Sequence, residues 1–135
     1  MKTSKCFKAA FVLILAIALN LLIAPFHPVQ AQAGCTKTWL GGAVLDPNGW
    51  QTAANWSPGV FLPTSTDDVC INSGPTVILN GSGSAKTVTV GAGQTLIVQG
   101  SGVGHGQLTA ATGVINNGTI NLDSFVSGWS AGLVV

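Results

Sequence analysis

The chain has 135 residues, of which 47% are hydrophobic and only 7% are charged, and its formal net charge is +1. Beyond residue 33, two lysines stand against four aspartates, so this part of the chain is weakly acidic. That balance excludes nucleic-acid binding through a basic surface. The same region holds all 18 glycines and many Thr, Ser, Asn and Val residues, which suit short strands and tight turns and disfavour helices.

Residues 1–33 have the features of a signal peptide. Three lysines precede a largely apolar run over 9–24, and Ala31 and Ala33 supply the small residues of a cleavage site. We therefore expect cleavage after Ala33 and a secreted or cell-surface location. A retained membrane anchor is the alternative, although a run of 16 residues is shorter than the roughly 20 that span a bilayer. A lipid on Cys35 is disfavoured, because Gln32 stands where a lipobox carries an aliphatic residue.

Two cysteines, Cys35 and Cys70, remain after Cys6 leaves with the signal peptide. An even pair in an exported chain predicts one disulfide, with two free thiols as the alternative. A bridge closing a loop of that length stabilises a fold by roughly 3–4 kcal/mol in the chain-entropy model. A metal site is disfavoured, because the remaining histidine, His105, is remote in sequence.

The segment 34–74 precedes the regular part of the chain and is expected to be a separate β module. Its stretch 49–71, GWQTAANWSPGVFLPTSTDDVCI, is rich in aromatic and turn-forming residues. Asp67 and Asp68 are expected to begin a strand, DVCIN, in which Val69 and Ile71 face one way and Cys70 the other. That alternation lets Cys70 reach Cys35 while its neighbours pack inward.

Residues 75–124 consist of short runs of alternating or apolar residues separated by glycine-rich segments. The runs cover 76–79, 87–90, 95–98, 107–110, 113–115 and 119–122. No window has helical periodicity, so an all-β fold without helices is expected beyond residue 34. One parity of each run is aliphatic, as in Leu96 and Val98. Strands recur at roughly 8–12 residues and every second or third strand at about 18–22, which favours stacked coils. The predicted fold is a right-handed parallel β-helix (β-solenoid) of about three coils, with an antiparallel β-sandwich as the alternative.

The run TVTVGAGQTLIVQGSG…GQLTAATGVINNGTINL resembles the β-helix passages of bacterial autotransporter-type surface adhesins. The portion P…DDVCI…G…VIL upstream is similar to the G8-type β-rich domain. The resemblance implies a structural or adhesive surface module at the N-terminal end of a longer β-helix. The alternative is a carbohydrate-binding or non-catalytic portion of a secreted polysaccharide-active β-helix enzyme.

The exposed end of a β-helix needs a cover over its apolar interior and its unpaired strand edges. Trp39, Trp50 and Trp56 supply large apolar area for such a cap, so 34–74 is interpreted as the N-terminal capping module. At the other end, residues 125–135 form a hydrophobic tail without charge. We expect the chain to continue into further coils beyond this tail. The alternative is that the tail folds back as a cap, with Trp129 over the last coil.

The sequence predicts no catalytic, cofactor-binding or metal-binding residues. The GWSAG of 128–132 matches a nucleophile elbow, but the chain order of its possible partners is wrong. Asp67 and Asp68 are adjacent, so within a strand they point to opposite faces and cannot flank one glycosidic bond. His105 is interpreted as an exposed loop residue. The expected partners are host or surface carbohydrate or protein, with no nucleic acid, no membrane after leader removal, and self-association through the last coil.

Overall fold

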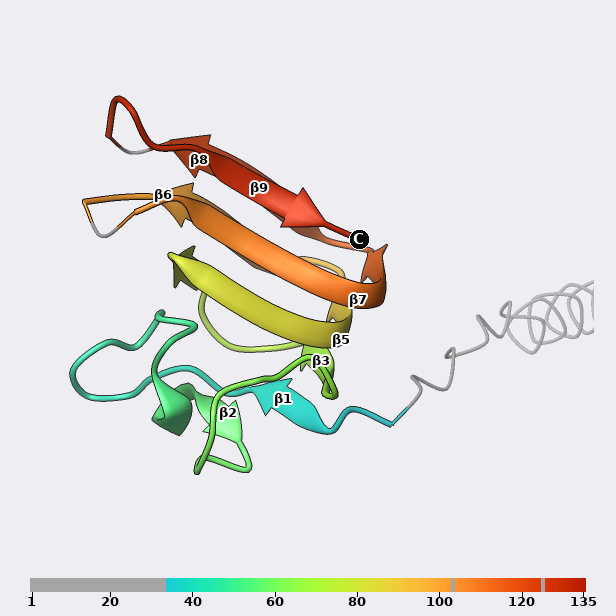
Figure 1. Cartoon of the computed structure of the whole chain (residues 1–135). Coiled ribbons are helices and arrows are strands. Elements are labelled where there is room, and N and C mark those ends of the chain that lie inside the picture. Colours follow the sequence, from blue (N-terminus) through green and yellow to red (C-terminus); the bar gives the residue numbers. More distant parts are fainter. Residues whose placement is uncertain (1–33, 103, 125) are drawn as a thin grey trace, which may run out of the picture. The chain divides into compact units, whose positions relative to one another are not determined.

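The computed structural model describes residues 34–102, 104–124 and 126–135, and the predicted signal peptide lies outside the described residues (Figure 1). Within these ranges the fold is all-β, with one three-residue 3₁₀ turn at Ala53–Asn55 and no α-helix. The strands are β1 (Lys37–Trp39), β2 (Trp56–Ser57), β3 (Asp68–Ile71), β4 (Val77–Asn80), β5 (Ser82–Val90), β6 (Thr95–Gly100), β7 (Gly106–Asn116), β8 (Thr119–Ser124) and β9 (Ala131–Val134).

The strands form two sheets in which nearly all pairings are parallel. One sheet has six strands in the order β2-β1-β3-β5-β7-β9, and the other has three in the order β4-β6-β8. Among the named strands of the described residues, only β1 and β2 pair antiparallel. The antiparallel alternative is therefore wrong for this chain: β5 does not pair with β6 across the GAGQ turn, because β5 pairs with β7 and β6 pairs with β4 and β8.

The chain alternates between the two sheets as it advances. From β4 onward, each strand of the small sheet is followed by a strand of the large one, and the next turn places its strands beside those of the turn before. Val77 pairs with Leu96, 19 residues later, and Leu96 pairs with Ile120, 24 residues later. The second interval is longer than the expected 18–22 residues mainly because its connection between the two sheets is longer. Residues 101–105 connect β6 to β7, whereas Gly81 alone connects β4 to β5 in the preceding turn.

The core consists of aliphatic side chains aligned in columns across neighbouring strands. Leu79 and Val98 form one such column in the small sheet, and Val69 and Val88 form another in the large sheet. All four side chains are completely buried. The alternation predicted for the runs 95–98 and 107–110 is confirmed, with one face of each turned to the interior.

Strand β5 begins earlier than the sequence predicts, because the glycine- and serine-rich segment before Lys86 is part of the sheet. Gly83 occupies an inward position where a side chain would be expected. A Cβ atom at Gly83 would lie 2.9 Å from Leu79 Cδ2 and 3.1 Å from Trp50 Nε1. These two large side chains fill the interior beside Gly83, so the strand packs well without side-chain volume of its own.

The predicted tail, 125–135, also contains regular structure, although Phe125 itself lies outside the described residues. Strand β9 pairs parallel with the first part of β7, from Gly106 opposite Ala131 to Thr109 opposite Val134. Part of the tail is therefore an edge strand of the six-stranded sheet, and residue 125 does not mark the end of the sheet structure.

Candidate functional site

The two ends of the sheet stack differ, and this difference defines the candidate site. We call the end formed by β1, β2 and residues 40–63 the covered end. There the large sheet finishes in the two-residue strand β2, and residues 48–50 lie along the outer edge of β4. Trp50 N donates to Ile78 O at 2.9 Å, and Ile78 N donates to Asn48 O at 2.7 Å. Backbone groups that a terminal strand would leave unpaired are thereby bonded.

The three tryptophans predicted to cap the fold meet inside the covered end. Trp39, Trp50 and Trp56 are buried almost completely. The Trp56 ring packs edge-on against Trp39, with centroids 4.9 Å apart, and against Trp50, with centroids 4.7 Å apart. Trp56 Nε1 donates to Trp50 O at 2.8 Å, and Trp39 Nε1 donates to Pro75 O at 2.9 Å. The rings thus add a bonded, close-packed aromatic layer to the core.

Asn55 fixes the shape of the loop between β1 and Trp50. Its buried amide nitrogen donates to Asp46 O at 2.7 Å and to Gly49 O at 3.0 Å, and its Oδ1 accepts from Ala43 N at 2.8 Å. In the sequence Asn55 stands out only as a possible glycosylation sequon, together with Asn80 and Asn117. In the folded protein Asn55 is inaccessible to a glycosyltransferase, whereas the other two are exposed.

Lys37 has a comparable role that the sequence does not reveal. It lies in β1 with only 6% of its surface exposed. Its ammonium group donates to Pro58 O at 3.0 Å and to Phe61 O at 2.9 Å. A buried charge is costly unless hydrogen-bonded, so these two bonds hold the 58–61 loop against β1.

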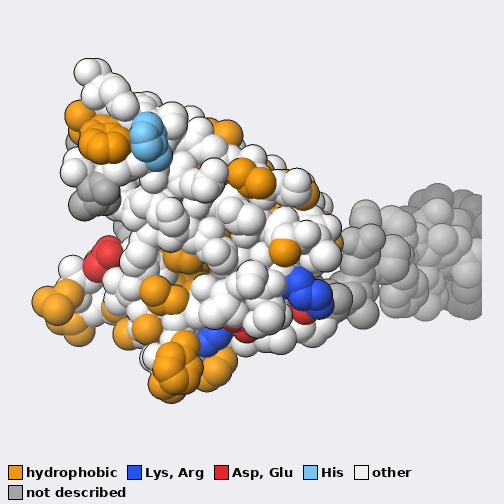
Figure 2. Space-filling model, in the orientation of Figure 1, with side chains coloured by type: hydrophobic (Ala, Val, Ile, Leu, Met, Phe, Trp, Pro, Cys, Tyr) orange, Lys and Arg blue, Asp and Glu red, His pale blue; other side chains and the backbone are white. Residues whose placement is uncertain are grey.

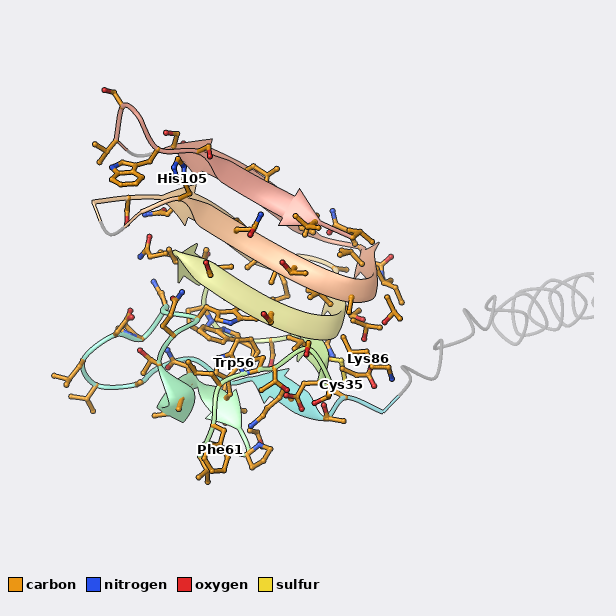
Figure 3. All side chains as sticks on the ribbon, in the orientation of Figure 1. Cys35, Trp56, Phe61, Lys86 and His105 are labelled. Carbon is orange, nitrogen blue, oxygen red and sulfur yellow. A yellow bond between two sulfur atoms is a disulfide. The ribbon has the colours of Figure 1, made fainter. Side chains whose placement is uncertain are left out.

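The predicted disulfide between Cys35 and Cys70 is present, with Cα atoms 5.8 Å apart (Figure 3). Bridges of this kind are typical of proteins that fold in an oxidising compartment. As expected, Cys70 bonds to Cys35, while Val69 and Ile71 pack in the hydrophobic core cluster; Cys70 itself is also buried, with 2% of its surface exposed.

Asp67 and Asp68 near the disulfide are structural hydrogen-bond acceptors. Burial alone would raise the pKa of Asp67, but bonds from the Thr64 hydroxyl, the Thr64 N–H and the Thr36 hydroxyl, with the charge of Lys37, lower it below its usual value. Bonds from Thr87 and Lys86 lower the pKa of Asp68. Both carboxylates are thus held in the charged form.

The opposite end, which we call the open end, consists of β8, β9 and residues 126–130. Within the described residues, β8 and β9 each pair with a strand on one side only. Leu122 continues the column of Leu79 and Val98, yet it is exposed while they are buried. Leu133 likewise continues the column of buried Leu108 and is only partly covered. The interior columns therefore reach the surface at this end.

A polar and aromatic cluster lies at one corner of the open end, where the loops after β6 and β8 meet (Figure 3). His105 Nδ1 lies 2.8 Å from Ser130 Oγ and accepts from Ser130 N at 3.0 Å. The Trp129 ring packs edge-on against His105, with centroids 5.0 Å apart. Ser124 Oγ donates to the carbonyls of Val126 and Trp129. The sequence gives no indication that His105 and Ser130 meet.

The His105–Ser130 pair has part of the geometry of a nucleophile and its base, but its bonding is that of a loop brace. Because the Ser130 N–H donates to Nδ1, that nitrogen serves to hold the backbone of 126–130. No carboxylate is hydrogen-bonded to His105 in the described part of the chain to orient the imidazole, as a catalytic triad requires.

In the described part of the chain, no group of three or more His, Cys, Asp and Glu side chains is placed to hold a metal ion. The same residues contain no helix that is long and apolar enough to cross a membrane.

Comparisons with known protein families, with curated proteins and with solved structures give no match to this chain.

Proposed function

We propose that the protein is an exported structural or adhesive module built as a right-handed parallel β-helix, with no catalysis of its own. The observation that carries this proposal is the contrast between the covered end and the open end. The first is sealed by paired backbone and three buried tryptophans, whereas the second presents unpaired strand edges and exposed interior columns. Such a unit is suited to begin a stack of coils.

The β-helix architecture is supported by the alternation of the chain between two parallel sheets. Successive turns align aliphatic residues in register, as in Val77, Leu96 and Ile120, which is the packing of stacked coils. The right-handed sense follows from the general rule that connections between parallel strands of one sheet turn that way in about 98% of cases. The large sheet contains such connections from β5 through β6 to β7.

The position at the N-terminal end of a longer β-helix is supported by the open end. Further coils of the kind found in autotransporter-type adhesins, which the sequence resembles, would extend both sheets and bury Leu122 and Leu133. Until something covers these residues, the open end favours self-association by edge-to-edge pairing.

Sedimentation velocity over a range of concentrations tests this proposal. The wild-type chain is expected to associate, and a double variant with Leu122→Lys and Val134→Lys is expected to remain monomeric, because charges on an edge oppose pairing. Val60→Lys at the covered end is the control and should associate like the wild type. A wild-type protein that stays monomeric at all concentrations would show that the open end needs no cover, and the proposal would be wrong.

A second candidate, carbohydrate binding, rests on the corner cluster of the open end. Trp129 is 36% exposed, and His105 and Ser130 beside it offer polar groups. An exposed indole edged by hydrogen-bonding groups can stack on a sugar ring. Affinity electrophoresis in gels containing polysaccharides tests this candidate. Retardation of the wild type that Trp129→Ala abolishes and Phe61→Ala leaves unchanged would support it, whereas unretarded migration in every polysaccharide would refute it.

A further inference from the structure

Two loops at the covered end carry apolar side chains that project into solvent. In the first loop, Val44 is 99% exposed and Leu45 is 97% exposed. In the second, Val60 is 69% exposed and Phe61 is 72% exposed. Figure 2 shows hydrophobic side chains standing out from the surface at this end, and Figure 3 shows Phe61 pointing away from the sheets. Side chains exposed to this extent stand out on convex loop tips and line no groove.

Both loops are held in shape from beneath by buried polar side chains. Asn55 bonds the backbone of the first loop at Ala43, Asp46 and Gly49. The Lys37 ammonium group bonds the backbone of the second loop at Pro58 and Phe61. A partner that meets these tips therefore meets surfaces that are already ordered, and binding costs little conformational entropy.

The four apolar side chains of the tips have one exposed charged neighbour, Asp46. The Lys37 ammonium faces inward to its two carbonyls. Asp46, next to Leu45, turns its carboxylate back over Gly49 and accepts a hydrogen bond from Thr52 Oγ1 at 3.3 Å. The tip side chains themselves make apolar contact without directional hydrogen bonds, which is what the acyl boundary of a bilayer provides. The exposed Asp46 carboxylate beside them disfavours anionic headgroups.

We propose that these two loops form a lipid-contacting surface, and that they insert Val44, Leu45, Val60 and Phe61 into the interface of a bilayer with neutral headgroups. Neutral lipid follows from charge, because the described residues carry four aspartates against two lysines. The sequence predicts no membrane contact after leader removal, since no apolar run remains. Two loops that are separate in the sequence can form a lipid-contacting surface without a continuous apolar run. The inference does not depend on whether further coils cover the open end.

Co-sedimentation with phosphatidylcholine vesicles tests the inference, using the protein recovered from the secreted fraction of a bacterial host. The loop variant carries Leu45→Ser and Phe61→Ser. The matched control carries Ile115→Ser and Val135→Ser, two exposed apolar residues outside the covered end. Any contribution of residues 1–33 is common to all three proteins. Equal melting temperatures establish that the variants are folded.

The wild type and the control are expected to partition onto the vesicles equally, and the loop variant at least about tenfold less, because two large apolar side chains no longer leave water. Binding should be unchanged by salt, since no charge contact is involved. Equal partitioning of the loop variant and the control would overturn the proposal. So would absence of wild-type binding, or binding that needs anionic lipid and disappears at high salt. A wild-type dimer that the loop variant dissociates, without vesicle binding, would assign the loops to a second copy instead.

Discussion

Replacing Trp56 tests whether the tryptophan layer holds the covered end together. The ring is completely buried and packs against two other indoles, and its Nε1 donates to Trp50 O. Truncation to alanine removes this burial, which costs about 3–5 kcal/mol in protein cores. It also removes two aromatic pairs of about 0.5–1.5 kcal/mol each. Because a domain is stable by only about 5–15 kcal/mol, Trp56→Ala is expected to leave much of the protein unfolded.

Trp56→Phe gives a measurable intermediate. It keeps most of the ring but removes the N–H, so the buried Trp50 carbonyl loses its partner at a cost of about 1–3 kcal/mol. The same change at the partly exposed Trp129 is the matched control and should cost less than about 1 kcal/mol. Urea unfolding followed by far-UV circular dichroism measures both. Equal urea midpoints for the two variants would refute the argument that the buried layer stabilises this end.

Three further predictions concern the disulfide, a close backbone approach and acid stability. Replacing both Cys35 and Cys70 by serine should lower the free energy of unfolding by about 4 kcal/mol for a sequence separation of 35, and reductant should then have no further effect on the melting temperature. Gly106→Ala should destabilise the fold by about 1–3 kcal/mol, because a Cβ would overlap the backbone of β6. Gly132→Ala, whose Cβ would have no atom within 4 Å, should be nearly neutral. Equal losses of unfolding free energy in the two variants would contradict this close approach. The lowered pKa of Asp67 stabilises the fold above the usual aspartate pKa near 3.9, and that stability is lost as the pH falls through the lower folded value. The melting temperature should therefore fall less between pH 5 and pH 2 in Asp67→Asn than in the wild type. An equal fall in the two proteins would count against this contribution of Asp67.

The sequence predicts those parts of the fold in which the type of each residue indicates whether its side chain is buried. Alternation in the run 95–98 identified Leu96 and Val98 as inward-facing, and both are completely buried. The even pair of cysteines in a chain with a predicted signal peptide likewise predicted the disulfide that the structure contains. The strand at Gly83 escaped prediction because the packing there comes from Leu79 and Trp50, whose contribution no local pattern encodes.

The candidate sites were predictable to a smaller extent, for the same reason. Aromatic residues in a small domain indicate burial by their size, so the three tryptophans could be singled out. Burial of Lys37 and Asn55 depends on carbonyl groups supplied by the folded loops around them, and a lysine in a strand or an asparagine in a sequon is ordinarily exposed. Nothing in the separation of His105 and Ser130 indicates that the loops after β6 and β8 lie side by side.

The covered end combines two properties that are physically linked. Asn55 lies six residues after Gly49, whose carbonyl it binds in the loop that it shapes. The next residue, Trp56, is at the centre of the aromatic layer. The bonds that order the first apolar loop and the packing that seals the core therefore depend on the same short segment. In a stack of coils each unit is stabilised by its neighbours, so the open end, with neighbours on one side, is the less protected of the two. A surface that must stay rigid while projecting apolar side chains is best placed at the covered end, where Asn55 and Lys37 fix it to the core.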